Sequence, residues 1–97
     1  MIVITKDKNR IALKGHAEYA EKGRDIVCAA VSMLVFNLQE SINRLTEDTV
    51  GFCFAADETV IFYGSISENA QLLIDSFIIG AELLSQSYPD NVRIDRA

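Results

Sequence analysis

The chain has 97 residues, which suffices for one domain with a two-layer core. Its formal net charge of -5 and its pI of ≈ 4.7 argue against electrostatic binding to nucleic acid and favour a basic partner. Hydrophobic residues make up 49% of the chain and the mean hydropathy is +0.16, an excess of apolar side chains that predicts a self-associating face.

The first half of the chain predicts a β-hairpin followed by a long helix. Residues 1–5 and 10–14 have the composition of short strands and flank a polar turn. Residues 17–24 are polar, lack a clear period and predict a loop. Asp25 is a favourable N-cap residue, and the apolar run after it predicts a helix over 26–44. A second apolar face predicts that this helix is buried on more than one side; it consists of Ala29, Met33 and Phe36.

The second half begins with another predicted hairpin, with strands over 50–55 and 59–64. The dipeptides Glu47-Asp48 and Asp57-Glu58 are interpreted as solvated turn charges. Cys53 lies among phenylalanines and is expected to be an inert core residue. The aromatic residues expected to pack the core, with one or two available to line a substrate pocket, are Phe52, Phe54, Phe62, Phe77 and Tyr88.

A second helix follows and extends to about residue 86, ending before Pro89. Ser65, which has capping-box spacing, competes with Ser67 as its N-cap residue. Residues 92–94 are suited to a short edge strand. The element order ββαββα, which this strand would extend, predicts an α+β fold of two layers, with two helices packed on an antiparallel sheet. We expect residues 1–97 to form a single domain.

Cysteine and histidine usage bounds the chemistry. Two cysteines and no signal peptide predict reduced thiols in a cytoplasmic protein. The apolar runs are too short and too often interrupted to span a bilayer, so no membrane association is expected. One histidine and two cysteines fall short of a four-ligand zinc site, so we expect no metal.

Cys28 and His16 are the minimum parts of a thiol nucleophile and its base. With Asp25 as N-cap, Cys28 occupies the first turn of the helix, where the partial positive charge favours a thiolate. Backbone N–H groups there, including that of Cys28, are expected to be unpaired and able to bind an oxyanion. His16 can take the thiol proton and return it to the leaving amine. From the residues alone, two alternatives remain open: Cys28 as a small buried hydrophobic residue, and His16 as a structural or surface residue.

Three neighbouring residues have two interpretations each. Asp25 is an N-cap or, alternatively, orients the imidazolium of His16. Ser32 lies one turn beyond Cys28 and either contacts the reacting groups or bonds back to the Cys28 carbonyl. Gly15 either admits the close approach of a substrate backbone or serves turn geometry. Gly23 either acts as a hinge of the loop or serves turn geometry.

The sequence resembles the ribosomal-processing cysteine protease family (Prp). The elements Gly15-His16-Ala17 and Gly-x-Asp-Ile-Val-Cys-Ala-Ala-Val-Ser, here residues 23–32, have about the family's spacing. The resemblance is tight over 15–34 and looser elsewhere, where it rests on length, element order and the terminal Tyr88-Pro89-Asp90. It implies a catalytic dyad of His16 and Cys28. The other family motif positions are Gly15, Asp25 and Ser32.

The resemblance also implies a cytoplasmic endopeptidase and homodimer that needs no metal or cofactor. Its substrate would be large-subunit ribosomal protein twenty-seven, which is a basic protein. The enzyme would remove the short N-terminal extension of this protein, which is hydrophobic and contains aromatic residues. An apolar groove beside Cys28 would suit that extension. Residues 17–24 suggest a further hypothesis, a loop that covers the site until a specific peptide binds.

Two other functions remain as alternative hypotheses to the protease. One is a non-catalytic dimeric adaptor, whose apolar helices form an interface and whose acidic surface binds a basic protein. The other is a thiol-redox sensor using Cys28, against which the lack of an adjacent resolving cysteine counts.

Overall fold

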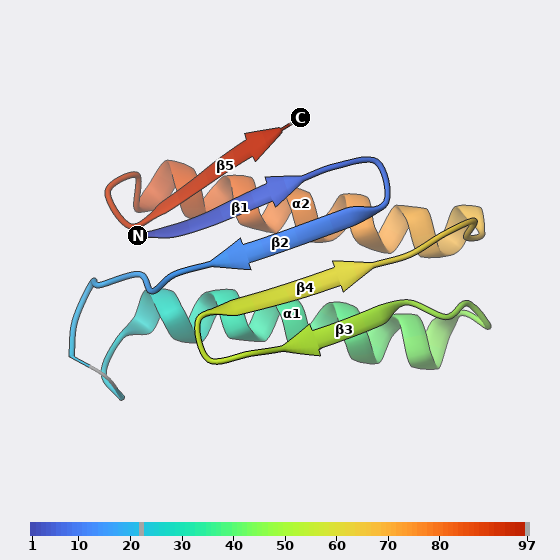
Figure 1. Ribbon diagram of the computed structural model, residues 1–97, viewed down its shortest axis with the longest axis horizontal. Helices are drawn as coiled ribbons and strands as arrows, with labels where there is room; N and C mark the ends of the chain where they lie inside the picture. Colours follow the sequence, from blue (N-terminus) through green and yellow to red (C-terminus); the bar gives the residue numbers. More distant parts are fainter. Residues whose placement is uncertain (22, 97) are drawn as a thin grey trace.

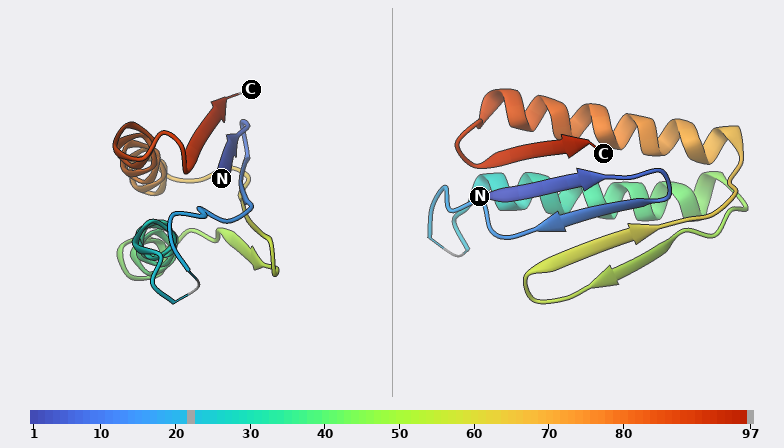
Figure 2. Two further views of the ribbon diagram at one scale, coloured as in Figure 1. Left: turned by 90° about the vertical axis from the view of Figure 1, so that its left-hand side faces the viewer. Right: turned by 45° about the horizontal axis from the view of Figure 1, so that its top comes forward.

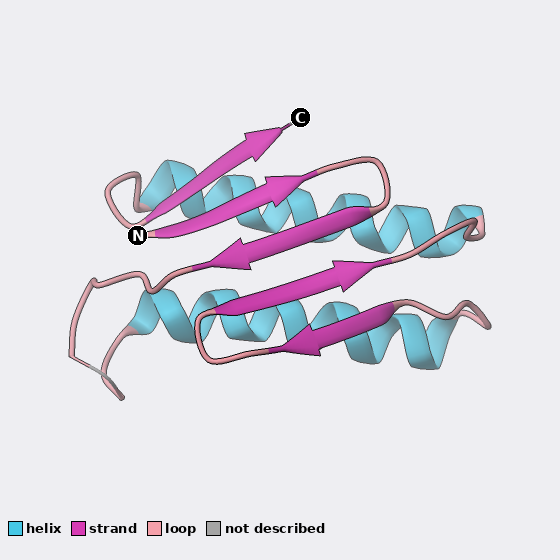
Figure 3. Cartoon of the chain, viewed as in Figure 1, coloured by secondary structure: helices cyan, strands magenta, loops and turns pink. Residues whose placement is uncertain are grey.

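The computed structural model describes residues 1–21 and 23–96; Lys22, which falls in the predicted loop, and Ala97 lie outside the described residues. Figures 1 and 3 show the elements in chain order. They are β1 (Ile2–Lys6), β2 (Arg10–Lys14), α1 (Ile26–Leu45), β3 (Gly51–Phe54), β4 (Glu58–Phe62), α2 (Glu68–Ser87) and β5 (Val92–Arg96). The predicted α+β order is confirmed, and the optional C-terminal strand is present.

The strands of the described residues form one sheet in the order β3-β4-β2-β1-β5. Neighbouring pairs are antiparallel, except that β5 lies parallel to β1, with Ile2 opposite Val92. In the chain, α2 connects β4 to β5 and runs antiparallel to both strands. For this reason β5 points in the same direction as β4 (Figure 1). The predicted edge strand therefore exists, and it makes the sheet mixed instead of wholly antiparallel.

Both helices cover the same face of the sheet, which leaves the opposite face uncovered (Figure 2, left). Alternate strand residues point to the covered face, among them Ile4, Ile11 and Ile61, each fully buried. The helices contribute apolar stripes with a spacing of three or four residues. These stripes are Val27, Val31, Val35, Leu38 and Ile42 on α1, and Ala70, Ile74, Phe77, Ile78 and Ala81 on α2.

The second apolar face of α1 is not buried. Met33 is 64% exposed and Phe36 is 49% exposed, so the predicted burial of α1 on more than one side is wrong for the isolated chain. With 20 residues and a mean hydropathy of 1.4 over its most apolar stretch, α1 also has the length and composition of a membrane-spanning helix. The expectation that no apolar run is long enough to span a bilayer is therefore wrong. In this fold, however, the buried stripe of α1 packs into the core.

Cys53 and two phenylalanines are also more exposed than expected. Because strand residues alternate, Phe52 and Phe54 lie on the helix-covered side of β3, and Cys53 lies on the uncovered side. Cys53 is therefore exposed, and its assignment to the core is wrong. Phe54 and Phe62 are 49% and 51% exposed; of the aromatic residues expected in the core, Phe77 is buried and Phe52 and Tyr88 are partly buried.

The start of α2 is held by Asp48, which comes from the connection between α1 and β3. Ser67, not Ser65, is the N-cap residue, and its hydroxyl accepts the Ala70 N–H at 3.2 Å. The Asp48 carboxylate in turn accepts hydrogen bonds from the Ser67 hydroxyl and, at 3.0 Å, from the Ser67 N–H. These bonds hold the pKa of Asp48 below its ordinary value. Asp48 is thus a structural carboxylate and not a solvated turn charge.

Candidate active site

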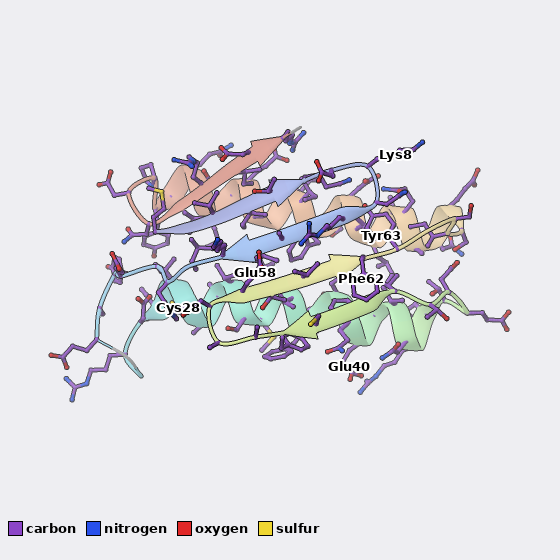
Figure 4. The ribbon with its side chains drawn as sticks, viewed as in Figure 1. Lys8, Cys28, Glu40, Glu58, Phe62 and Tyr63 are labelled. Carbon is purple, nitrogen blue, oxygen red and sulfur yellow. The ribbon has the colours of Figure 1, made fainter. Side chains whose placement is uncertain are left out.

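A surface cavity of ≈ 240 Å³ lies where the start of α1 meets the end of β2 and the β3–β4 hairpin. Figure 4 shows Cys28 of α1 and Glu58 of β4 at this same end of the molecule. Four predicted site residues line the cavity: Gly15, His16, Cys28 and Ser32. Segments separated in sequence are therefore brought together here.

Asp25 begins α1 and determines the surroundings of Cys28. Its backbone is extended, and its Oδ1 accepts the N–H groups of Val27 at 3.0 Å and Cys28 at 2.9 Å. The N-cap interpretation of Asp25 thus matches the geometry. The expectation that the Cys28 N–H is unpaired is wrong, because the capping carboxylate uses that donor.

The same carboxylate holds the loop that precedes α1. Its Oδ2 accepts the N–H groups of Tyr19 at 3.0 Å and Ala20 at 3.3 Å. Hydrogen bonds from the N–H groups of Cys28, and then of Ala20, Tyr19 and Val27, hold the pKa of Asp25 below its ordinary value, although partial burial opposes them. Asp25 therefore remains ionised and joins the loop to the helix.

The polypeptide at His16 and Ala17 lies directly against the side chain of Cys28. The Ala17 N–H points at the sulfur of Cys28, with 3.4 Å between nitrogen and Sγ. Ala17 is itself buried, and its carbonyl accepts a hydrogen bond of 2.9 Å from the Asn91 side chain. Further along the loop, the rings of Tyr19 and Tyr88 meet edge to face, with their centroids 5.4 Å apart. These contacts fix the backbone beside Cys28.

The carboxylate that meets His16 is Asp57, not Asp25. Oδ1 of Asp57 lies 2.9 Å from Nε2 of His16. The hydrogen bonds of the Asp25 carboxylate within the described residues all come from backbone N–H groups. Sequence analysis missed Asp57, because 41 residues separate it from His16 and a turn position is usually solvated. Only the pairing of β2 with β4 could have indicated it.

Gly15 lies at the point where the chain leaves β2. Its φ is +94°, and a Cβ at this position would lie 2.5 Å from the carbonyl oxygen of Met1. The close approach that Gly15 permits is thus to its own chain. Gly23 has a φ of +89° with open space around it, as a left-handed turn requires. Glycine serves backbone conformation at both positions.

Ser32 is exposed and lies in the cavity wall one turn after Cys28. Its hydroxyl makes no hydrogen bond to any group in residues 1–21 and 23–96, so the predicted bond to the Cys28 carbonyl is not formed there. The hydroxyl is therefore available to a bound molecule.

Part of the cavity wall is apolar. Val31 and Val35 form part of its wall beside Phe36 and Phe54. The rings of Phe36 and Phe54 are 5.8 Å apart, and both are half exposed. Of the five aromatic residues considered from the sequence, Phe54 lines the cavity, and Phe36 joins it from the helix face that was expected to be buried. The cavity wall thus combines polar side chains, His16 and Ser32, with the aromatic pair Phe36 and Phe54.

Similarity to known proteins extends over nearly the whole chain. The family model of the cysteine protease Prp matches residues 1–93. The ribosomal processing cysteine protease Prp of Mycoplasma genitalium is 56% identical over 97 residues, covering 98% of this chain and 95% of the relative. The protein of the same name from Bacillus subtilis is 33% identical over 91 residues, covering 84% of this chain and 80% of the relative.

Solved structures share the fold. The essential ribosomal processing protease Prp from S. aureus, in complex with a covalently linked product peptide, matches with a TM-score of 0.89 at 23% identity, covering 99% of this chain and 97% of that one. A protein from Streptococcus mutans matches with a TM-score of 0.77 at 31% identity, covering 99% and 93%. The chain described here therefore belongs to the Prp family of ribosomal processing cysteine proteases.

Proposed function

We propose that this chain is an endopeptidase in which Cys28 is the nucleophile and His16 is the general base and acid. One observation carries the proposal: both residues line a single cavity, and the backbone between His16 and Ala17 touches the sulfur, with 3.4 Å from the Ala17 nitrogen to Sγ. Family membership supports the protease over the adaptor and the thiol sensor.

The first half of the reaction forms an acyl-enzyme. His16 takes the proton from Cys28, and the sulfur attacks the peptide carbonyl carbon to form a C–S bond. Because Asp25 engages the Cys28 N–H, the Ala17 N–H is the backbone donor that we assign to the oxyanion. The C–N bond then breaks, and His16 gives its proton to the departing amine.

The second half releases the N-terminal fragment. His16 takes a proton from water, whose oxygen attacks the thioester carbonyl. The C–S bond breaks, and the sulfur of Cys28 leaves as thiolate and regains a proton from His16. The fragment departs as a carboxylic acid, which gives its proton to solvent water and becomes a carboxylate. No metal or cofactor takes part in either half.

We propose large-subunit ribosomal protein twenty-seven, bearing its short N-terminal extension, as the substrate. An extension that is hydrophobic and contains aromatic residues suits the wall formed by Phe36 and Phe54. The net charge of -5 suits a basic protein and speeds its encounter with the enzyme. Ser32 is available to a backbone group of the bound peptide.

The substrate proposal is tested by intact-mass spectrometry of two forms of this ribosomal protein, with and without the extension. We expect a single N-terminal fragment from the extended form and no change in the trimmed form. His16→Ala should leave the extended form uncut. Cutting at several sites, or cutting of the trimmed form, would contradict the assignment of this substrate.

We also propose that the chain acts in the cytoplasm as a homodimer. Large apolar side chains are exposed on both helices, as a self-associating surface requires. They are Ile26, Met33, Phe36 and Leu45 on α1, and Leu72, Ile79 and Leu83 on α2. Light scattering coupled to size exclusion tests this: a mass of one chain at micromolar concentration would contradict it.

A further inference from the structure

The contact between His16 and Asp57 has a geometry that ordinary surface ion pairs lack. Both side chains are largely exposed, at 64% and 75%, so the contact adds little to folding stability. The main chain nevertheless brings the two residues together: the Gly15 N–H donates to the Asp57 carbonyl at 2.9 Å. This backbone hydrogen bond fixes the main chain next to His16 and at Asp57, from which the two side chains meet.

Sheet register explains why this backbone contact forms. In the β2–β4 ladder Lys14 lies opposite Glu58, so the next pair along the strands is Gly15 with Asp57. The turn itself is closed by the Ala55 N–H, which donates to the Glu58 carbonyl at 2.8 Å. Asp57 is thus held at the end of a hairpin, one residue from the position opposite His16.

The two nitrogens of the His16 ring then have different surroundings. Nε2, the nitrogen farther from the main chain, is bound by Asp57. Nδ1 is nearer the main chain, and the main chain at Ala17 lies 3.4 Å from the Cys28 sulfur. With Nε2 occupied, Nδ1 is the nitrogen left to receive the thiol proton.

We propose that Asp57 is a positioning residue of this active site. Its carboxylate accepts the Nε2–H of His16, which keeps Nδ1 unprotonated and orients the ring towards Cys28. In the reaction the proton moves from Sγ to Nδ1 and then to the leaving amine. The Nε2–H stays on the ring, and Asp57 stays ionised throughout. This role rests on the proposed dyad of His16 and Cys28.

Two substitutions separate hydrogen bonding from charge. Asp57→Asn keeps an oxygen that can accept the Nε2–H, whereas Asp57→Ala removes the acceptor. We expect Asp57→Ala to slow single-turnover cleavage of the extended ribosomal protein by about 10²-fold, as misplaced catalytic groups do, and Asp57→Asn to slow it less. Asp7→Ala is the matched control, since Asp7 lies in the β1–β2 turn at the opposite end of the sheet (Figure 1).

Nuclear magnetic resonance provides a readout that a purely structural role would not change. His16 is the only histidine, so its ring nitrogens are assigned without ambiguity. We expect the Nε2–H tautomer in the unmodified chain and in Asp57→Asn, and a mixture that includes the Nδ1–H tautomer in Asp57→Ala. An unchanged tautomer together with unchanged cleavage in folded Asp57→Ala would overturn the proposal, as would faster cleavage.

The alkylation rate of Cys28 distinguishes failure of this proposal from failure of the dyad. Peptide mapping after iodoacetamide treatment reports Cys28, with exposed Cys53 as an internal reference. If His16→Ala leaves the Cys28 rate unchanged, the dyad itself is wrong. If His16→Ala slows it and Asp57→Ala does not, only the role of Asp57 is wrong. If both slow it and the double variant is no slower than His16→Ala, Asp57 acts through His16.

Discussion

The backbone N–H of Cys28 donates to the Asp25 carboxylate at 2.9 Å, so Cys28 and the loop before α1 are held by one side chain. The other oxygen of that carboxylate accepts the N–H groups of Tyr19 and Ala20. A loop that opens for substrate must therefore break the bonds from Tyr19 and Ala20 to Oδ2, whereas Oδ1 can continue to accept the Cys28 N–H.

Replacing Asp25 should loosen the loop. In Asp25→Ala the amides of Tyr19 and Ala20 lose their acceptor, so we expect their hydrogen exchange to quicken and cleavage to slow. Asp48→Ala is a matched control, because Asp48 likewise holds a helix start, but that of α2. It should lower thermal stability and leave the exchange of Tyr19 and Ala20 unchanged. If neither amide responds to Asp25→Ala, Asp25 does not hold the loop.

Acid should release the same contacts. Because the folded-state pKa of Asp25 lies below its unfolded value, its contribution to stability is present above the unfolded pKa and is lost as pH falls through the folded pKa. We therefore expect exchange protection at Tyr19 and Ala20, corrected for the intrinsic pH dependence of exchange, to disappear at pH values below about 3.9. Asp25→Asn should remove this acid dependence, and its persistence there would assign it to another group.

Gly15→Ala should be more harmful than other glycine substitutions. Alanine at a φ of +94° is strained by about 1–3 kcal/mol, and its Cβ would also meet the Met1 carbonyl oxygen. Gly23→Ala has strain from its φ but open space, and Gly64→Ala has neither. Chemical denaturation should rank the losses of unfolding free energy as Gly15, then Gly23, then Gly64. Equal losses for Gly15→Ala and Gly64→Ala would contradict the described chain path.

The aromatic wall should affect substrate binding more than the chemical step. Truncating Phe36 or Phe54 to alanine removes apolar surface from the cavity, and we expect KM for the extended ribosomal protein to rise by about tenfold with a smaller change in kcat. The two rings contact each other, so the double variant should lose less than the sum. Phe62→Ala, on the uncovered face of the sheet, is the control and should keep KM.

Local signals in the sequence were sufficient for the elements and for part of the site. The Asp25 N-cap and the helix predicted from the apolar run after it are short-range patterns, and the structure agrees with both. Cys53 was misassigned because hydrophobicity was weighed above alternation, although the phase of Phe52 and Phe54 places Cys53 on the opposite face.

The remaining features depend on pairings that no local pattern contains. Asp57 reaches His16 only because β4 pairs with β2 in one register. The parallel pairing of β5 with β1 joins the two ends of the chain in the same way. The Asp25 carboxylate was expected to cap α1. That it also accepts hydrogen bonds from the N–H groups of Tyr19 and Ala20 depends on the path of the loop.

The central claim is that Cys28 performs peptide cleavage, and the two cysteines of the chain allow it to be tested directly. Intact-mass spectrometry of the extended ribosomal protein should be run with the unmodified chain, Cys28→Ala and Cys53→Ala. We predict that the fragment is released by the unmodified chain and by Cys53→Ala at equal rates, and not by folded Cys28→Ala. Cleavage at the same bond by Cys28→Ala, or its loss in Cys53→Ala alone, would contradict the account.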